Sequence, residues 1–280
     1  QLARFNPISL ARLRPDLMNF RTHRKIVVCD GRVGFTGGVN VCDAHSAAAR
    51  GDRAWRDSHL QLEGTPVGDL QLAFLEDWHF ATGDAPSAAD YFPHHSRADA
   101  GPWVQVLASG PDDESYAIEK FCFAAIAGAR QRVLVTTPYF VPTEPLLLAL
   151  GTTALRGVDV QILVPQRSDS RLVTAAARSY FDELVRVGVR IHEYQSTMLH
   201  AKTLVVDDIG LIGTANMDHR SFRLNFEVAA ALLDRSLAAS LAEMFQADLQ
   251  QAAEYRSQHR RAGAWQRFSE AAARLLSPLL

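Results

Sequence analysis

The chain has 280 residues, of which 48% are hydrophobic and 21% are charged, a composition that suits one large globular domain or two smaller ones. Its formal net charge of -2 argues against nucleic acid as a partner, because phosphate contacts usually require an excess of Lys and Arg. The three cysteines form no Cys-x-x-Cys pair, which argues against a zinc site and a disulfide framework.

Two similar stretches organise the chain. The first starts at Phe20 and reads FRTHRKIVVCDGRVGFTGGVN; the second starts at Thr197 and reads TMLHAKTLVVDDIGLIGTAN. In each stretch a run of β-branched residues predicts a strand, over 24–30 and over 201–207, followed by a turn and a short second strand. The spacing between the stretches has the length of a domain, which is too long for a solenoid repeat.

Between the two stretches, predicted strands alternate with predicted helices. WRDSHLQLEG predicts a strand, after which Thr65 as N-cap and Pro66 in the first turn open a helix that ends near Thr82. Residues 83–102 are rich in Pro, Ala and polar residues and predict a linker. The elements expected after it are strands at 103–108, 132–137, 158–164 and 189–193, and helices at 114–129, 144–156 and 170–187. The alternation predicts an α/β fold with a largely parallel sheet covered by helices.

The two stretches differ in what precedes them. Predicted α/β structure fills residues 103–197 before His200, but only residues 1–22 precede His23. We therefore expect two pseudo-symmetric α/β/α domains, the first incomplete at its N-terminus, with an unpaired sheet edge and uncovered apolar surface. Because the chain starts at Gln1 rather than Met, an upstream start is expected. The expected boundaries are a partial first domain at 1–82, the linker at 83–102, a second domain at 103–261 and an amphipathic tail at 262–280.

Both stretches carry residues that suit an anionic substrate. Side chains alternate faces along a strand, so the His and the Lys of each His-x-Lys share a face. The aspartates that follow the strands, Asp30 and Asp207, have the other parity and are expected to hold the strand end or the turn. The Gly-rich turn returns Asn40 and Asn216 to the His–Lys pairs, where Lys supplies charge and Asn supplies amide donors. Two such triplets, face to face, would surround one tetrahedral phosphate.

Two histidines suggest a division of labour. A neutral imidazole can attack phosphorus, while a protonated one donates to the leaving oxygen and later deprotonates the acceptor. Each histidine needs a carboxylate on its far nitrogen, and each copy offers one acid in the predicted next strand. Asp57 lies 34 residues after His23, and Glu227 lies 27 residues after His200. One His-x-Lys alone is usually a surface accident, and one Gly-Gly-x-Asn is usually only a hairpin, but the doubled pattern favours catalysis.

The two stretches resemble the HxKxxxxD motifs of the phospholipase D superfamily, and the chain is most similar to bacterial cardiolipin synthases. WRDSHLQLEG, TPYFVPTEPLL, HAKTLVVDD and NMDHRSFRLNFE carry this similarity, which extends over nearly the whole chain. The resemblance implies an active site between two α/β domains, a phosphohistidine intermediate, and no metal or other cofactor. It also implies that one phosphatidylglycerol gives its phosphatidyl group to another, with release of glycerol.

The resemblance assigns roles to individual residues. It implies a neighbourhood lined by residues 138–142, Asp169 and residues 220–221, with the first histidine as nucleophile and the second as acid and base. It implies phosphatidylglycerol and an anionic membrane surface as partners, no nucleic acid, and a place at the bacterial inner membrane, peripheral or facing the cytoplasm. The implied catalytic residues are His23, Lys25, Asp30, His200, Lys202 and Asp207, with Asn40 and Asn216 on the phosphate. Asp57 and Glu227 are expected to orient the histidines because of their positions after the two stretches, and not because of the resemblance.

The chain departs from the synthases in three ways, one of which is the missing first half of the first domain. The synthases carry N-terminal membrane helices, whereas no apolar run here approaches the roughly 20 residues that span a bilayer. Five residues separate Asp207 from Gly213, but six separate Asp30 from Gly37, and this shorter hairpin could displace Asn216. The alternatives left open are a hydrolase of the same chemistry, a nuclease, which the charge disfavours, and a catalytically incomplete fragment that binds membranes or a partner.

The C-terminal tail has helical periodicity. Its apolar stripe could lie in a membrane interface with arginines near lipid phosphates, or it could pack on the second domain. The stripe consists of Trp265, Phe268, Ala272, Leu275, Leu276 and Leu279.

Overall fold

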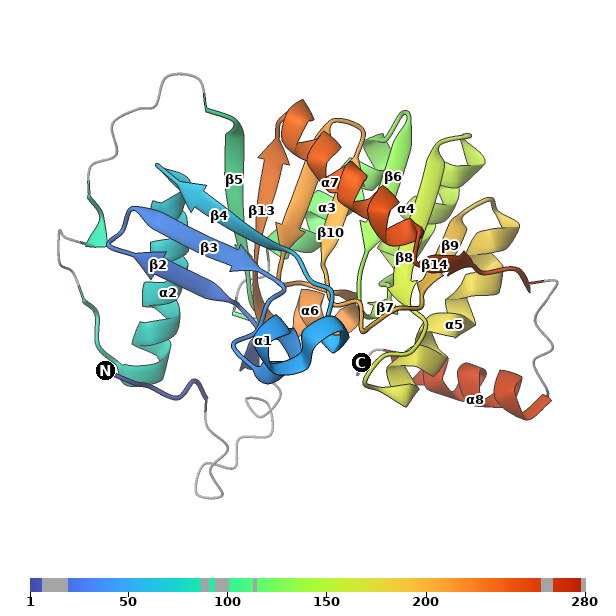
Figure 1. The fold of residues 1–280 in the computed structure, drawn as a ribbon, viewed down its shortest axis with the longest axis horizontal. Helices are drawn as coiled ribbons and strands as arrows, with labels where there is room; N and C mark the ends of the chain where they lie inside the picture. Colours follow the sequence, from blue (N-terminus) through green and yellow to red (C-terminus); the bar gives the residue numbers. More distant parts are fainter. Residues whose placement is uncertain (7–19, 87–90, 94–100, 113–114, 258–263, 278–280) are drawn as a thin grey trace.

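A mixed sheet with helices on both faces, and a smaller antiparallel sheet beside it, make up the protein in the computed structural model (Figure 1). The structure describes residues 1–6, 20–86, 91–93, 101–112, 115–257 and 264–277.

The strands and helices have the following bounds. The strands are β1 (Arg21–Thr22), β2 (Ile26–Cys29), β3 (Val33–Gly37), β4 (His59–Glu63), β5 (Trp103–Ser109), β6 (Arg132–Thr136), β7 (Phe140–Val141), β8 (Asp159–Pro165), β9 (Arg190–Tyr194), β10 (Thr203–Val206), β11 (Ile209–Gly213), β12 (Met217–Asp218), β13 (Asn225–Leu233) and β14 (Ala252–Glu254). The helices are α1 (Ala47–Arg50), α2 (Pro66–Thr82), α3 (Ala117–Gly128), α4 (Glu144–Leu155), α5 (Arg171–Arg186), α6 (His219–Arg223), α7 (Arg235–Leu249) and α8 (Ala264–Leu275), with 3-10 turns η1 (Asp43–His45) and η2 (Gly51–Arg53).

Local sequence signals predicted most of the longer elements. Both stretches form the expected hairpins, β2–β3 and β10–β11, and α2 begins and ends at the predicted residues. Gly83 closes α2 at a φ of 79°, a conformation that glycine adopts without strain. Thr65 stands at the N-cap position as predicted, but it has helical dihedral angles and its side chain makes no capping hydrogen bond.

The prediction of a largely parallel sheet was wrong. Within the described residues the large sheet has the order β1-β13-β11-β10-β6-β8-β9-β14, with β5 on β13. Only β6–β8, β8–β9 and β1–β13 pair in parallel, and all its other pairings are antiparallel. The difference arises because β10, β11, β13 and β5 follow β6 in the sheet with alternating direction, so each of these four pairings is antiparallel.

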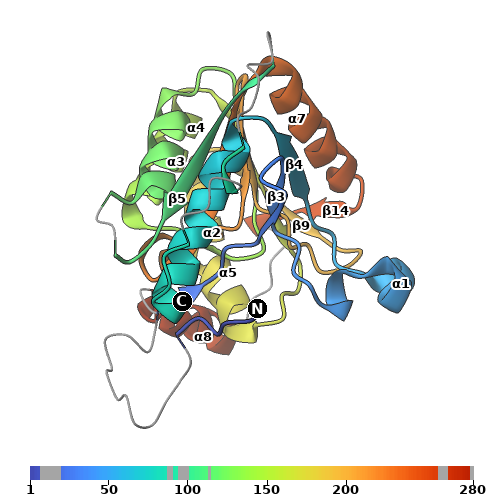
Figure 2. The ribbon, with the colours of Figure 1, turned by 90° about the vertical axis from the view of Figure 1, so that its left-hand side faces the viewer.

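Helices cover both faces of the large sheet, with α3 and α4 on one side and α7 on the other (Figure 2). Along β6, Val133 and Val135 belong to the core cluster with α3, α4 and α5, whereas Leu134 belongs to the cluster with α7. Leu62 and Leu70, from β4 and α2, join the second cluster, so the small sheet packs on the same side as α7. This alternation is what strands buried on both faces require.

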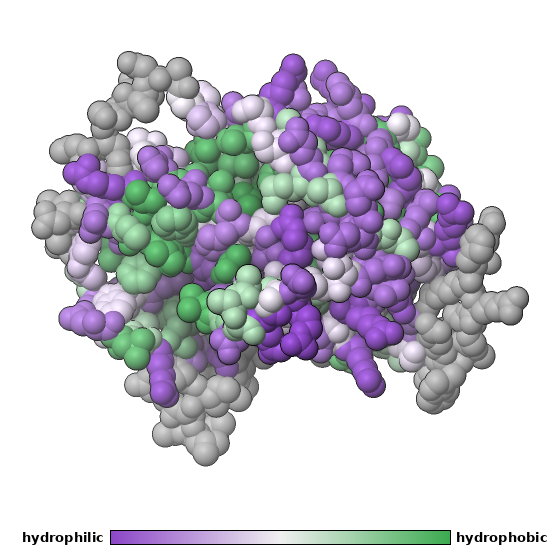
Figure 3. Space-filling view, in the orientation of Figure 1, coloured by the Kyte–Doolittle hydropathy of each residue, from purple (hydrophilic) through white to green (hydrophobic). Residues whose placement is uncertain are grey.

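The small sheet has an open edge. Among the described residues, β2 pairs only with β3, and β4 is the other outer strand. Val27 on β2 and Phe74 on α2 are exposed, and apolar side chains gather over this part of the molecule (Figure 3). A groove of about 880 Å³ lined by Ile26, Val28 and Trp78 lies there. Within the described residues, the expected unpaired edge and uncovered apolar surface are therefore present, and their effect on stability stays a prediction.

Among the side chains that the structure describes, the tail docks on α5 through residues outside its predicted stripe. Ala273 is buried, Tyr180 Oη donates to Ser277 Oγ at 2.9 Å, and Arg274 pairs with Glu183 at 3.0 Å. From the stripe, Leu275 is 83% and Leu276 is 43% exposed. The side chains of Trp265, Phe268 and Leu279 lie outside the described residues. In the part of the chain that is described, no helix is long and apolar enough to cross a membrane.

Candidate active site

Parallel backbone pairing joins the first stretch to the strand that carries Glu227, and joins the second stretch to the segment that carries Asp57. β1 pairs with β13, and the His23 N–H donates to the Phe226 carbonyl at 2.9 Å. The second junction is a parallel bridge in which the His200 N–H donates to the Arg56 carbonyl at 2.7 Å. These two junctions set each histidine beside a carboxylate from the other copy.

The histidine–carboxylate pairs are therefore crossed. His23 Nδ1 lies 3.0 Å from both carboxylate oxygens of Glu227. His200 Nδ1 lies 2.7 Å from Asp57 Oδ2. The structure thus brings both predicted acids to histidines, but each to the histidine of the other stretch. Glu227 lies in a strand as predicted, whereas Asp57 lies in the segment before β4, which corrects its expected place within a strand.

Glu227 is a charged group in a closed environment. It is completely buried and accepts hydrogen bonds from Thr214 Oγ1 and from Asn225 Nδ2 at 3.2 Å. Burial alone would raise the pKa of this carboxyl, but the charge and hydrogen bond of His23, with Thr214 and Lys25, hold its pKa below the ordinary value. Glu227 is therefore ionised and fixed in position.

The Gly-rich turn makes room for the other acid. A side chain at Gly38 would place its Cβ 2.1 Å from Asp57 Oδ1, so the carboxylate occupies space that only glycine leaves free. The Ser58 N–H donates to Asp57 Oδ1 at 2.7 Å, which leaves Oδ2 for His200.

The two lysines lie beside their histidines and are deprived of solvent. Lys25 Nζ donates to the His23 carbonyl at 2.7 Å, and Lys202 Nζ lies 3.0 Å from His200 Nδ1. Burial lowers the pKa of Lys25 to about 8 and that of Lys202 to about 7. Both pKa values also respond to the charges of Asp57 and Glu227, so the two halves form one electrostatic site.

His200 is neutral in this environment near pH 7. Its burial lowers the pKa of the imidazole to about 4, against the upward effect of the Asp57 hydrogen bond and with a further downward effect of Lys202. The His23 side chain is more accessible, at 28% exposed, and its Nδ1 is occupied by Glu227. Nε2 is consequently the nitrogen of His23 that is available for chemistry.

The structure does not bring Asp30 and Asp207 to the histidines. The Asp207 carboxylate accepts the backbone N–H groups of Arg130, Gln131 and Arg132 at 2.9, 2.8 and 3.0 Å and holds the turn before β6. Although burial opposes its charge, these donors keep its pKa below the ordinary value. It stands at the opposite end of β10 from Lys202, and Asp30 is exposed after β2.

The asparagines keep equivalent positions, so the expectation that the shorter hairpin displaces Asn216 was wrong. The second hairpin is one residue shorter than the first, and the missing residue falls in the turn, outside the paired strands. In each hairpin, the residue directly after the Lys pairs with a residue on the second strand, and the Asn lies four residues beyond that partner. The two pairings are Ile26↔Thr36 and Thr203↔Ile212.

The asparagines differ in their surroundings. Asn216 is buried, shares a small cavity with Lys202, and its Oδ1 has no hydrogen-bond partner among the described residues. Asn40 Nδ2 lies 3.5 Å from Nε2 of His45. Of the residues implied by resemblance to line the site, Asp169 accepts from Tyr139 Oη at 2.6 Å.

Sequence reasoning missed His45. Its ring centroid lies 5.0 Å from that of His200, and its Nδ1 lies 3.4 Å from Asp57 Oδ2. It also contacts Trp55, whose ring lies 5.2 Å from His200. No periodic signal marks this position, and only its place between the Gly-rich turn and Asp57 could have drawn attention to it.

One group in the described part of the chain has the spacing of metal ligands: atoms of His45, Asp57 and His200 lie within 4.8 Å of one another. Lys202 Nζ, 3.0 Å from His200 Nδ1, would repel a divalent cation there. The 2.7 Å contact between His200 and Asp57 also has the length of a charge-assisted hydrogen bond. We therefore assign this group to proton chemistry.

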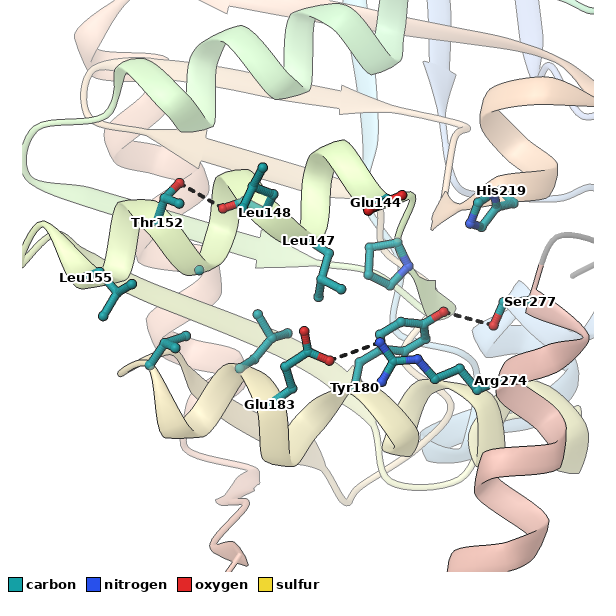
Figure 4. A pocket seen from close by; sticks show the side chains of 14 residues that line it. Glu144, Leu147, Leu148, Thr152, Leu155, Tyr180, Glu183, His219, Arg274 and Ser277 are labelled. Atoms are coloured by element: carbon teal, nitrogen blue, oxygen red, sulfur yellow. Dashed lines mark hydrogen bonds and ion pairs between the residues drawn. The ribbon is translucent and has the colours of Figure 1, made fainter.

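A groove of about 620 Å³ runs between α4 and α5 (Figure 4). Leu147 and Leu155 make part of its wall apolar. His219, Arg274 and Ser277 lie together at the opposite end of the groove from Leu155. His219 directly follows Asp218, a buried residue whose pKa responds to Glu227 and His23. The polar end of the groove is therefore adjacent in the chain to the candidate active site.

The comparisons with known proteins agree with this architecture. Residues 122–249 match the family model "Cardiolipin synthase, PLD-like domain". The chain is 45% identical over 268 residues to cardiolipin synthase 2 of Bacillus cereus, covering 95% of this chain and 52% of that protein. It is 43% identical over 280 residues to cardiolipin synthase of Geobacillus kaustophilus, covering 99% of this chain and 55% of that protein. The chain thus spans about half the length of these curated relatives.

A solved structure supports the fold. Phosphatidylserine synthase of Haemophilus influenzae superposes with a TM-score of 0.69 over 95% of this chain and 72% of that one. At 14% identity this likeness shows the fold alone. The chain has the α/β fold of the phospholipase D superfamily, and its residues 122–249 match the PLD-like domain. Within it, the chain resembles the bacterial cardiolipin synthases.

Proposed function

We propose that this chain is the catalytic part of a phosphatidyltransferase that makes cardiolipin from two phosphatidylglycerol molecules and releases glycerol. The crossed histidine–carboxylate pairs carry the proposal, because they set two oriented imidazoles and two lysines in one site without requiring a metal. The likeness to cardiolipin synthases over nearly the whole chain supports the choice of lipid substrate.

In the first step, His23 Nε2 attacks the phosphorus of one phosphatidylglycerol. A P–N bond forms, the P–O bond to the glycerol headgroup breaks, and His200 gives its proton to the departing oxygen. Glu227 holds Nδ1 of His23 and stabilises the positive ring that results. Lys25 and Lys202 lie where they can balance the charge on the phosphate oxygens.

In the second step, His200 takes the proton from a hydroxyl of the second phosphatidylglycerol. That oxygen attacks the phosphohistidine, the P–N bond breaks, and cardiolipin leaves with neutral His23 restored. Asn40 and Asn216 are proposed to contact the phosphate oxygens during both steps. Asp30 and Asp207 are proposed to support the hairpins rather than the chemistry, since the Asp207 carboxylate accepts three backbone N–H groups away from the histidines.

His200 must carry a proton before it can act as the acid. The low pKa of His200 opposes this, because burial and Lys202 disfavour the imidazolium. An anionic phosphodiester beside the ring would raise the pKa of His200 and supply the missing stabilisation. Substrate binding and protonation of His200 are therefore coupled in this mechanism.

Membrane contact belongs to the same proposal. The exposed Leu275 and Leu276 on α8 and the apolar groove between α4 and α5 offer apolar surface to a lipid layer. We propose a peripheral place at an anionic membrane, which is the bacterial inner membrane for proteins of this kind. The proposed domain boundaries remain at 1–82 and 103–261.

The test uses vesicles in which phosphatidylglycerol is the only lipid. Release of glycerol in step with cardiolipin formation is the expected result. Formation of phosphatidic acid without cardiolipin would show a hydrolase instead, and no turnover of any phosphodiester would show a catalytically incomplete fragment. Acid-labile phosphate should be trapped on the parent chain and on His200→Ala but not on His23→Ala; trapping on His200 alone would reverse the two roles.

A further inference from the structure

His45 is an imidazole held in place at the candidate active site, although the mechanism above does not use it. It ends the short turn η1, and its side chain is only 3% exposed. Its ring packs edge-on against His200 and tilts against Trp55, at centroid distances of 5.0 and 5.2 Å. A histidine so enclosed has fixed ring nitrogens, and each needs a polar neighbour.

The neighbours of the ring define its tautomer. Asn40 Nδ2 can only donate, so Nε2 of His45, 3.5 Å away, is the acceptor. The proton of the neutral ring is then on Nδ1, and the carboxylate oxygen nearest to it is Asp57 Oδ2 at 3.4 Å. That contact falls outside hydrogen-bond geometry here, and Nδ1 is a buried atom without a hydrogen-bond partner in the described residues. Contacts of this kind in unliganded sites often shorten when substrate binds.

Asp57 Oδ2 is thus the common target of two imidazoles. His200 Nδ1 approaches it at 2.7 Å and His45 Nδ1 at 3.4 Å. The order of contacts is Asn40 to His45 to Asp57 to His200, which links an asparagine proposed to hold the phosphate to the proposed acid and base. We infer that His45 is a positioning residue that shares the Asp57 carboxylate with His200 and thereby sets the protonation of His200. This inference rests on the proton-transfer role proposed for His200.

The direction of the effect follows from the charges around the ring. Asp57, Lys202, Lys25, His200 and His59 are the ionisable groups that act on or respond to His45. Burial lowers the pKa of His45, so the ring is neutral near pH 7. A neutral N–H directed at the carboxylate offsets part of its negative charge, and His45 itself acts to lower the pKa of His200. Removing His45 should therefore make His200 easier to protonate.

The experiment compares three substitutions at one position. His45→Phe keeps the ring and removes both nitrogens. His45→Asn keeps a donor near the place of Nδ1, and His45→Gln keeps one near the place of Nε2. Imidazole NMR titration of the unliganded chain with labelled histidine gives the midpoint for His200 directly. This readout needs no turnover, so it stands even where the proposed transfer reaction fails.

We expect His45→Phe and His45→Gln to raise the His200 midpoint by about one pH unit, a tenfold change in proton affinity. His45→Asn should stay near the parent value. His79→Phe, at an exposed histidine of α2, is the matched control and should leave the midpoint unchanged. A midpoint unchanged in His45→Phe, or moved equally in the Asn and Gln variants, would overturn the inference. If His45→Phe does not fold, the Asn and Gln pair decides alone.

Discussion

Replacing Glu227 by Gln tests the crossed pairing most directly. The substitution keeps the size of the side chain and an oxygen that can accept from Thr214, but it removes the charge that faces His23. Glu227 has no exposure to water, so no solvent screens the change. The amide can also present its NH₂ group to Nδ1 of His23, which would favour the wrong tautomer for attack by Nε2.

The distances set the size of the effect. Unit charges separated by the 3.0 Å between His23 Nδ1 and Glu227 interact by roughly 5 kcal/mol at an effective dielectric constant of about 20. The net value of a hydrogen bond to a charged group is smaller, about 1.5–3 kcal/mol. Loss of that stabilisation, with the tautomer penalty, predicts a rate of phosphohistidine formation on the order of 10²–10⁴ lower.

The assay is single-turnover trapping of the phosphohistidine, with thermal unfolding measured on the same preparations. Glu193→Gln is the matched control, because it removes a 2.7 Å ion pair with Arg178 in the same large sheet but outside the site. The control should keep the parent rate. A Glu227→Gln protein that forms the intermediate within about fivefold of the parent rate would refute the reasoning. The acid would then serve the core of β13, and His23 would be oriented by its backbone bond alone.

Three other changes have defined outcomes. Asp207→Ala should lower the free energy of unfolding in urea by about 1–2 kcal/mol, since three backbone N–H groups lose their acceptor, and should spare turnover; lost turnover at full stability would give Asp207 a direct role. Burial lowers the pKa of Lys202 to about 7, so turnover should fall as the pH rises through 7. Lys202→Arg should shift this loss of turnover to higher pH, and an unchanged pH profile above 7 would contradict the prediction. Leu275→Ser with Leu276→Ser should weaken binding to phosphatidylglycerol vesicles roughly tenfold at an unchanged melting temperature, whereas unaltered binding would exclude this face of α8.

Signals confined to a few neighbouring residues predicted the elements that carry the site. The β-branched runs ending in Asp30 and Asp207 gave both hairpins, and Pro66 with Gly83 gave the ends of α2. Each depends on chain stiffness or turn conformation, which a single sequence records. The candidate acids were also identifiable, because a buried histidine needs a carboxylate and few acids follow the two stretches.

The pairing between distant segments was beyond such signals. The bond from His23 to Phe226 and the bridge from Arg56 to Leu199 join residues that local periodicity does not relate. Counting residues predicted that Asn216 could be displaced, but the missing residue falls in the turn, outside the paired strands. The apolar stripe predicted that α8 is a helix, but it did not predict which face of the helix docks. The docking face depends on contacts with Tyr180 and Glu183 of α5.

The crossed arrangement joins the doubled motif into one candidate site. Glu227 reaches His23 only because β1 pairs with β13 in the large sheet. Asp57 reaches His200 only because Arg56 pairs with Leu199, the residue before His200. Neither half therefore contains a histidine with its own carboxylate. A displacement of the small sheet against the large one would pull Asp57 away from His200, and separation of β1 from β13 would leave the buried Glu227 without its imidazole, at a cost of several kcal/mol for the unpaired charge. The interface is thus held by the same contacts that orient the two rings, and the orientation of each histidine reports on the docking of the other half.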